Sequence, residues 1–170
     1  MNDPTPRHSL FRSLYELLKP VPETERREIL DEVMTWSGAS REGRPSHRTM
    51  TPDELITLEE TGLLQVGVHT LTHPLLPSLS VAAQRHEITQ GRVRLQQILG
   101  HAVSDVCYPF GAYTADTVAL VRSAAFTFAC SVSSAVVDPD TDRFQLPRIH
   151  LSDWDGEEFS ARLAMLANSQ

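Results

Sequence analysis

Two histidines, His69 and His73, stand four residues apart in the stretch VGVHTLTHPLL. A short apolar run precedes His69, and Pro74 directly follows His73. Neutral imidazole nitrogens are common zinc ligands, and at this i, i+4 spacing two of them share one face if the intervening TLT coils helically. The pair predicts half of a metal site, although two histidines in an ordinary exposed loop would give the same pattern.

The stretch CYPFGAY holds a second group of candidate residues. Pro109 cannot continue the pairing of a central strand, and Gly111 allows a sharp turn. A strand that ends in this way directs its backbone N–H groups outward, where they could hold an oxyanion. The alternative is a structural turn with Phe110 and Tyr113 packed beside it.

A third candidate, His150, follows Leu146 and Ile149 at the end of the extended piece FQLPRIHL. Histidine suits general acid catalysis because its pKa lies near the operating pH of most enzymes. A surface or hydrogen-bonded core histidine is the alternative. We interpret Asp153 and Asp155 as helix caps rather than catalytic groups.

These residues follow apolar segments that alternate with helical patterns. Three runs have strand length, namely LLQVGVH, AVSDVCYPFG and FTFACSVS. The intervening patterns predict one helix from Ser80 to near Gly100 and another over TADTVALVRSAAF. This alternation indicates βαβ units and parallel strands, whose carboxyl ends collect the chemistry of such folds. The residues of all three candidate segments lie at those ends.

Capping signals mark the other predicted helices. In TPDELITLEETG, Thr51 is an N-cap, and Glu54 stands three residues after it. A closing helix, DGEEFSARLAML, has Asp155 and Glu158 at capping-box positions. The buried side of the helix that starts at Ser80 is predicted to contain Val81, Ile88, Val93 or Leu95, and Leu99.

The first fifty residues have a different character. Apolar residues from Leu10 to Leu18 share one helical face, and Pro20 ends that helix. A second helix is predicted from Pro22 to Trp36, with Gly38 just beyond it, and the polar stretch SGASREGRPSHR then indicates a linker. We therefore expect a helical segment with linker over residues 1–50 and an α/β region over residues 51–170.

The composition is that of one globular domain. The chain has 170 residues, of which 41% are apolar and 22% charged. A net charge of −7 argues against a nucleic acid or an anionic membrane as partner. We expect no membrane span and a cytoplasmic location, because no long apolar run or secretory signal is present. The cysteines, Cys107 and Cys130, are expected to be buried reduced thiols rather than a disulfide.

Three motifs resemble those of one enzyme family. HTLTH is similar to the His-Ser/Thr-x-x-His motif of the polysaccharide deacetylases, which include chitin, chitooligosaccharide and peptidoglycan deacetylases. YPFGAY resembles the next motif of that family, and LPRIH resembles its terminal motif. The three occur in the family's order, and the resemblance covers about residues 50 to 168.

The resemblance implies an α/β fold, a partial (β/α) barrel of the deacetylase type with an N-terminal helical pair. It also implies a metal-dependent hydrolase that removes an N-acetyl group from an amino sugar or oligosaccharide. The roles that it implies are His69 and His73 as ligands of Zn²⁺ or another divalent cation, the backbone of Tyr108 in the oxyanion hole, His150 as the acid that protonates the departing amine, and Pro109, Phe110, Gly111 and Tyr113 as substrate contacts.

The chain departs from the family in one respect that concerns activity. Relatives open with a strand ending Thr-Phe-Asp-Asp-Gly, whose aspartates supply the base and a third metal ligand, and this stretch is absent. Cys107 and Tyr108 also stand where relatives have an arginine before the proline motif. The resemblance therefore implies weak zinc binding by this chain alone. It also implies an exposed sheet edge, which a second polypeptide or copy completes, which the N-terminal helices cover, or which marks the chain as a truncated remnant.

Three hypotheses remain open at this point. The first is a deacetylase whose missing aspartates come from a partner chain. The second is a non-catalytic remnant that binds a metal or a carbohydrate. The third is a protein-interaction module whose N-terminal helices dock on another subunit.

Overall fold

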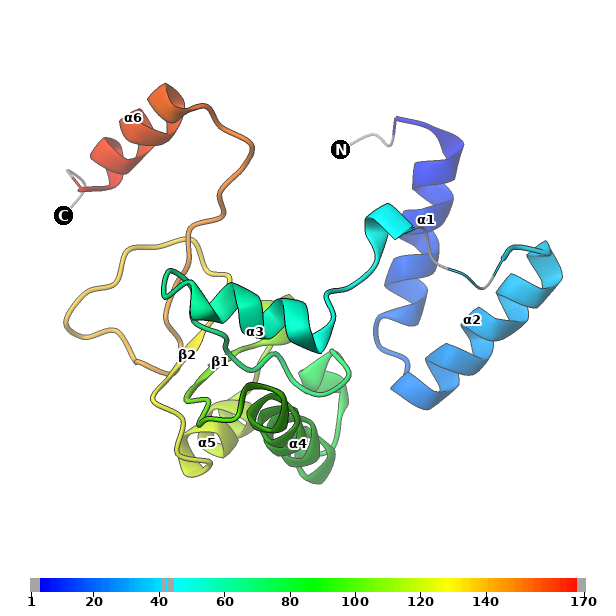
Figure 1. Ribbon diagram of the computed structural model, residues 1–170, viewed down its shortest axis with the longest axis horizontal. Coiled ribbons are helices and arrows are strands. Elements are labelled where there is room, and N and C mark those ends of the chain that lie inside the picture. The colour runs from blue at the N-terminus through cyan, green and yellow to red at the C-terminus, as the bar shows by residue number, and fades with distance from the viewer. Residues whose placement is uncertain (1–3, 41, 43–44, 168–170) are drawn as a thin grey trace.

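The computed structural model describes residues 4–40, 42 and 45–167, and its centre is a small parallel sheet (Figure 1). Strand β1 (Asp105–Cys107) pairs with β2 (Phe128–Cys130) in parallel, with Val106 opposite Ala129. Single parallel bridges extend the sheet on both sides, from Val68 to Val106 and from Leu146 to Cys130. Four extended segments therefore follow one another across the sheet in chain order.

The predicted strands are shorter than their apolar runs. LLQVGVH pairs through Val68, whose N–H donates to the Asp105 carbonyl and whose own carbonyl accepts from the Cys107 N–H, both at 2.8 Å. The segment around Val68 cannot form a longer ladder, because its partner strand β1 comprises only three residues. β1 is short because the 3₁₀ turn Pro109–Gly111 follows it almost at once.

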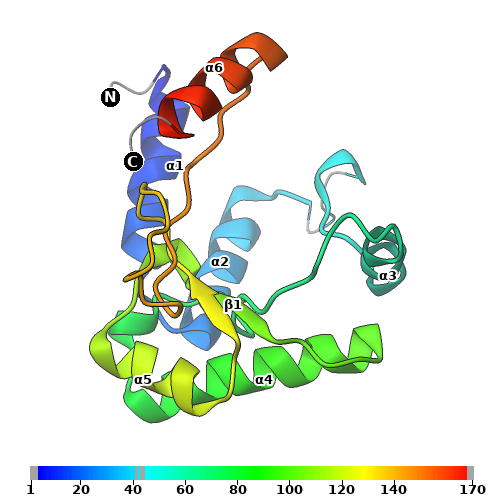
Figure 2. The same cartoon turned by 90° about the vertical axis from the view of Figure 1, so that its left-hand side faces the viewer.

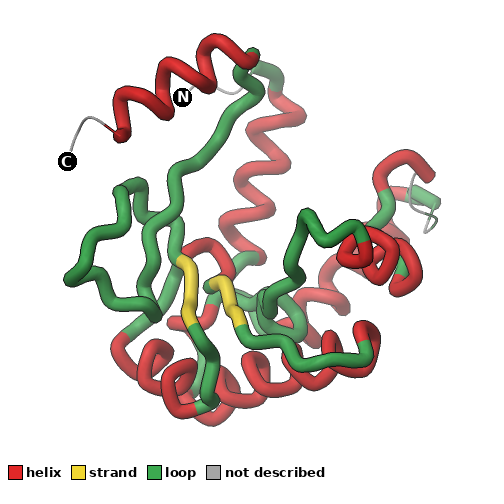
Figure 3. The backbone as a smooth tube through the Cα atoms, turned by 60° about the vertical axis from the view of Figure 1, so that its left-hand side comes forward, coloured by secondary structure: helices red, strands yellow, loops and turns green. Residues whose placement is uncertain are grey.

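Helices α4 (Val81–Leu99) and α5 (Ala115–Ser123) cover one face of the strands (Figures 2 and 3). The N-cap Ser80 and the left-handed Gly100 bound α4 as predicted. Thr114 begins α5 with a capping box. The core between these helices and the sheet consists of Val68, Leu76, Ile88, Val103, Val106, Tyr108, Val118, Leu120, Val121, Phe126, Ala129 and Phe144.

The buried side of α4 differs from the prediction. Val81 and Val93 are 46% and 43% exposed, whereas Ile88 is buried as expected, and Leu95, the predicted alternative to Val93, and Leu99 pack against the core. Gln84 and Gly91 are the other buried residues of the helix. Gln84 is buried because its amide oxygen accepts a hydrogen bond of 2.6 Å from the Thr117 hydroxyl of α5. A polar link between the helices thus replaces part of the expected apolar stripe.

Two further helices carry the caps predicted for them. Thr51 and Glu54 form the predicted capping box at the start of α3 (Pro52–Glu60). Asp155 accepts from the backbone N–H groups of Glu157 and Glu158 before α6 (Gly156–Ala167). The Glu158 carboxylate pairs with Arg162. Short 3₁₀ turns occur at Pro45–His47 and Leu76–Ser78.

The N-terminal helices α1 (Pro6–Leu18) and α2 (Glu23–Ser37) form a hairpin beside the α/β part (Figure 1). Gly38, with φ of 65°, ends α2 as predicted. Both helices lie wholly within the described residues, and neither contributes a residue to the core. The linker prediction falls partly on residues 41, 43 and 44, which lie outside the described residues.

Two other properties concern the whole chain. Among the residues described, no helix combines the length and apolarity needed to cross a bilayer. Cys107 and Cys130, paired in register across β1 and β2, are both free thiols and half-buried. Burial raises the pKa of each thiol, so both are protonated near neutral pH.

Candidate active site

The loop after Val68 brings the two histidines of HTLTH together. The ring centroids of His69 and His73 lie 4.7 Å apart, with 63° between the ring planes. Thr70 and His73 both have left-handed backbone, with φ of 65° and 57°. The Thr70 hydroxyl donates to the His69 carbonyl and accepts from the His73 N–H, at 2.6 and 3.1 Å. A tight reversal, rather than a helical turn, therefore makes the two rings neighbours.

Unusual backbone conformation is concentrated at this site. In the described part of the chain four non-glycine residues have positive φ, and three of them are Thr70, His73 and Phe110. Such conformations cost on the order of 1–3 kcal/mol each and persist where surrounding contacts hold them. The loop and the turn beside it must therefore be fixed by their neighbours.

Helix α4 supplies those contacts through Glu87 and Gly91. The Glu87 carboxylate accepts from the N–H groups of Leu71 and Thr72, at 3.0 and 2.9 Å, and from the Thr72 hydroxyl at 2.9 Å. Gly91 is buried, and a Cβ added there would meet the Thr70 carbonyl carbon at 2.6 Å. The sequence analysis missed both residues. Their i, i+4 spacing on the buried side of α4 was the available signal.

The protonation of both imidazoles suits metal binding. His69 Nδ1 lies 2.8 Å from the Cys107 carbonyl oxygen, which can only accept, so in the neutral ring Nδ1 carries the proton and Nε2 has the free lone pair. A backbone carbonyl behind a ring nitrogen is the usual outer contact of a metal-ligating histidine. Partial burial lowers the pKa of His73, and the neighbouring His69 and Arg26 lower it further. Neutral His73 is also the form that a metal requires.

A metal site built on this histidine pair would be incomplete. A catalytic zinc ion is normally held by three protein ligands and a water molecule. Within residues 4–40, 42 and 45–167, no group of three His, Cys, Asp or Glu side chains could hold an ion. His69 and His73 fit two of the positions around a divalent cation, and the described residues supply no third.

The proline turn forms one wall of the site. The Phe110 ring meets the His73 ring edge-on, with centroids 4.6 Å apart and 71° between the planes. Pro109, the first residue of the turn, is buried. The N–H groups of Gly111 and Ala112 close the turn by donating to the carbonyls of Tyr108 and Pro109, at 2.9 and 3.0 Å. The predicted Pro-Phe-Gly contact segment thus lies beside the histidine pair.

The structure does not support the role assigned to the Tyr108 backbone. Its N–H donates to the Cys130 carbonyl at 3.2 Å as part of the sheet, so it is not available to an oxyanion. The buried phenol donates to the Phe144 carbonyl at 2.8 Å, and burial raises the pKa of Tyr108. Tyr108 is therefore a structural residue. The amide of Phe110 is the remaining candidate in this turn.

Two predicted site residues border other hollows. Tyr113 packs against Tyr108, with ring centroids 4.7 Å apart, and lines a hollow of about 610 Å³ with Arg122 and Gln145. His150 is exposed and borders a hollow of about 260 Å³ together with Val132. The structure therefore brings His69, His73 and Phe110 together, and it places Tyr113 and His150 apart from them.

The segment that carries His150 nevertheless reaches the same turn. Arg148 donates to the Cys107 sulfur at 2.7 Å, and Cys107 is the residue whose carbonyl accepts from His69. Val132, which lines the His150 hollow, faces Gly111, where an added Cβ would meet it at 2.1 Å. The hollow of His150 therefore borders the Pro109–Gly111 turn through Val132. Arg148 is a third residue, after Glu87 and Gly91, that the sequence patterns did not identify.

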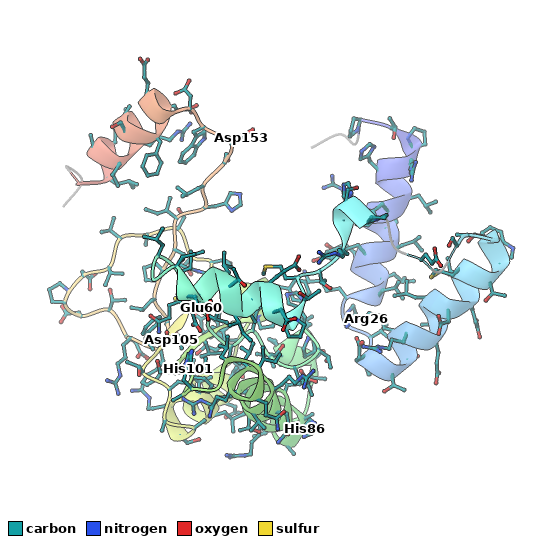
Figure 4. The ribbon with its side chains drawn as sticks, in the orientation of Figure 1. Arg26, Glu60, His86, His101, Asp105 and Asp153 are labelled. Carbon is teal, nitrogen blue, oxygen red and sulfur yellow. The ribbon has the colours of Figure 1, made fainter. Side chains whose placement is uncertain are left out.

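The N-terminal hairpin contacts the site from its open side. The Tyr15 ring meets the Phe110 ring at 6.3 Å, and the Lys19 ammonium lies 4.8 Å from the centre of the same ring. Arg26 donates to the Thr72 carbonyl at 3.2 Å and also pairs with Glu23. Figure 4 shows Arg26 near the start of α2, on the side that faces the α/β part. The helical pair is thus a wall of the candidate site.

Comparison with known protein families gives one match. The model of the polysaccharide deacetylase family matches residues 34–129, which is more than half of the chain. A search of curated proteins found no significant match.

Several solved structures share the fold. Streptococcus pyogenes deacetylase PplD in complex with acetate aligns with a TM-score of 0.63 and 19% identity, over 69% of this chain and 52% of that one. IcaB from Ammonifex degensii gives 0.61 and 18%, over 76% and 57%. BC0361, a polysaccharide deacetylase from Bacillus cereus, gives 0.58 and 20%, over 69% and 37%. The predicted deacetylase-type fold is confirmed as a partial barrel, because the chain spans about half or less of these structures.

Proposed function

The chain belongs to the polysaccharide deacetylase family, and on this premise we propose that it takes part in metal-dependent hydrolysis of an N-acyl group, such as acetyl, from an amino sugar. The observation that supports this most directly is the pairing of the His69 and His73 rings, 4.7 Å apart, beside the Phe110 turn. The substrate is an amino sugar or an oligosaccharide that contains one.

His69 and His73 would each provide one ring nitrogen to a divalent cation, zinc in the first instance. The bound metal supplies a Lewis acid for the amide carbonyl and a water molecule of lowered pKa. Glu87 and Gly91 hold the loop in which the two rings are neighbours. Phe110 would border the substrate on the opposite side of His73 from His69.

A second polypeptide would supply the missing carboxylates. Val68 holds the segment over residues 63–69 to β1, and Leu63 and Leu64 on this segment are 87% and 53% exposed. An exposed extended segment with apolar side chains is where a further strand can add to a sheet. We propose that the added strand ends in the paired aspartates, which would place a third ligand and a base beside the histidines.

Zinc binding tests the first half of this proposal. Isothermal titration of the purified chain should show one weak zinc site, and His73→Ala should abolish it. His86 lies on the outer side of α4 (Figure 4), so His86→Ala is the matched control and should bind zinc as the wild type does. Absence of zinc binding by the wild type would exclude the metal site.

Complementation tests the second half. The chain should release acetate from N-acetylated sugar oligomers only when mixed with a polypeptide that carries the upstream part of a deacetylase barrel and its paired aspartates. His73→Ala in this chain should abolish that activity, and His86→Ala should retain it. A mixture that assembles and binds zinc but releases no acetate would favour a non-catalytic binding function.

A further inference from the structure

An apolar cavity of about 470 Å³, open to solvent, lies between the N-terminal hairpin and the candidate site, and its lining residues Phe11 and Leu17 are 70% and 69% exposed. Helix α1 contributes Leu14 and Leu18 to its wall, and α2 contributes Ile29 and Leu30. His73 belongs to the same wall. The cavity therefore connects the apolar sides of the two hairpin helices with the His73 imidazole. Its volume is within the range of about 300–1,000 Å³ typical of small-molecule sites.

The lining of this cavity does not suit a glycan. Its polar side chains are Tyr15, Lys19, Arg26 and His73, and the remaining lining residues are apolar. Arg26 is already engaged with Glu23 and the Thr72 carbonyl. A sugar ring would leave most of its hydroxyl groups without partners, which is costly in an apolar site. A hydrocarbon chain has no polar groups that would lose hydrogen bonds in the cavity, and removing its apolar surface from water is favourable.

Substrate geometry gives the direction of entry. In the proposed hydrolysis the scissile carbonyl must lie at the His69–His73 pair, and the rest of the acyl group extends from that carbonyl on the side away from the sugar. His73 and Phe110 both face the cavity, so an acyl chain that continues past them enters it.

The charges at this end of the cavity agree with such a ligand. The Lys19 ammonium lies 4.8 Å from the centre of the Phe110 ring, and the Arg26 guanidinium lies within 3.2 Å of the Thr72 carbonyl. Both cations are therefore close to the place where the carbonyl oxygen, and later the product carboxylate, would lie. Because the Glu23 carboxylate pairs with Arg26, Lys19 is the cation whose field favours a polar or anionic head with an apolar tail behind it.

From these observations we infer that the cleaved group is a hydrocarbon acyl chain longer than acetyl, held in the cavity between α1 and α2. The inference rests on the proposed function. In the reaction, water adds its oxygen to the carbonyl carbon, the amide C–N bond breaks, and the departing nitrogen takes a proton. The products are a free amino sugar and a fatty carboxylate, and no oxidant or other co-reactant is needed.

The first test measures binding without catalysis. The probe is dansylaminoundecanoic acid, a fluorescent fatty acid, and dodecanoate and acetate are the competitors. We expect the wild type to bind the probe, dodecanoate to displace it, and acetate to leave it bound. Leu30→Asp, on the cavity wall, should weaken probe binding at least tenfold. Leu163→Asp, a similarly exposed leucine on α6, is the matched control and should have no effect.

Two further variants separate this inference from the proposed function. His69→Ala removes a metal ligand and leaves the cavity wall intact, so it should lose zinc and keep the probe. Circular dichroism should show native helix content in Leu30→Asp, because no α2 residue belongs to the core. Failure of the wild type to bind the probe overturns the inference whether or not zinc binds. A wild-type dimer that Leu30→Asp dissociates, without probe binding, would assign the cavity to a second copy and also overturn it.

The second test uses the complemented enzyme of the preceding section. Hydrolysis of N-dodecanoyl glucosamine oligomers should exceed that of the N-acetyl oligomers at equal concentration, and Leu30→Asp should reverse this preference. Hydrolysis of the acetyl substrate with rejection of the dodecanoyl one would overturn the inference and leave the proposed function intact.

Discussion

Gly91 in α4 lies so close to Thr70 that a methyl group added to it would stand 2.6 Å from the Thr70 carbonyl carbon. This approach joins the long helix to the loop between the two histidines. In an exposed helix, glycine-to-alanine substitution stabilises by about 1 kcal/mol. Here we expect Gly91→Ala to lower the free energy of unfolding by about 1–3 kcal/mol, because the clash is with backbone that cannot move aside. Urea unfolding measures the change.

The same substitution should weaken zinc binding, because a displaced Thr70 separates the two imidazoles. Gly156→Ala is the matched control, since a Cβ at Gly156 meets nothing within 4 Å. That variant should be at least as stable as the wild type and should keep its zinc affinity. Unchanged zinc affinity in Gly91→Ala would show that α4 does not position the loop.

Glu87 should behave as a positioning residue for the histidine loop. Its carboxylate accepts three hydrogen bonds, from the Leu71 N–H, the Thr72 N–H and the Thr72 hydroxyl. Glu87→Gln exchanges one acceptor oxygen for a donor, and we expect a loss of about 1–3 kcal/mol in the free energy of unfolding. Zinc affinity should fall as well, and both quantities can be measured on one preparation. Glu60→Gln, in exposed α3, is the control and should change neither.

The protonation state of His69 can be observed directly. Because Nδ1 faces the Cys107 carbonyl at 2.8 Å, the neutral ring should carry its proton on Nδ1. Long-range ¹H–¹⁵N spectra of the zinc-free chain should therefore show an unprotonated Nε2. Added zinc should change the ¹⁵N chemical shift of Nε2 more than that of Nδ1. A proton on Nε2 would leave that nitrogen without a lone pair for the metal and would contradict the proposed role of His69 as a ligand.

Tyr108 should prove structural rather than catalytic. Tyr108→Phe removes the 2.8 Å hydrogen bond to the Phe144 carbonyl and leaves that buried acceptor unsatisfied. We expect the free energy of unfolding to fall by about 1–3 kcal/mol, with zinc affinity unchanged. A loss of zinc binding at native stability would restore a direct role for this residue.

The same tyrosine gives a dependence of stability on pH. Burial raises the pKa of the Tyr108 phenol in the folded protein, so the folded state holds this proton more firmly than the unfolded state. The resulting stabilisation is complete below a pH of about 10, where the unfolded phenol is still protonated, and it is lost as the pH rises further. Unfolding free energies between pH 8 and about 11 should fall more steeply in the wild type than in Tyr108→Phe.

Much of the fold could be predicted because its signals are local. Thr51 with Glu54, Ser80 with Gly100, and Gly38 mark helix ends through contacts within a few residues, and the structure confirms each. The strands were predicted in order but not in length. A strand extends only as far as its neighbour, and the sequence of one segment carries no record of how long its partner is.

The residues of the candidate site could be predicted from the sequence, but their geometry could not. HTLTH and YPFGAY identified His69, His73 and Phe110, which the structure brings together. The pairing of the Tyr108 amide with Cys130 and the separate hollow of His150 depend on how distant segments cross the sheet. Local patterns cannot show such crossings.

The sequence by itself thus determined the family, the order of parallel α/β elements and the pair of imidazoles, because capping, periodicity and motif spacing act over a few residues. Tertiary structure alone decided that Glu87 and Gly91 fix the histidine loop, and that the N-terminal hairpin forms an apolar cavity against His73. These relationships join residues that lie tens of positions apart in the chain. They exist only after packing has brought the helices, the loop and the turn into contact.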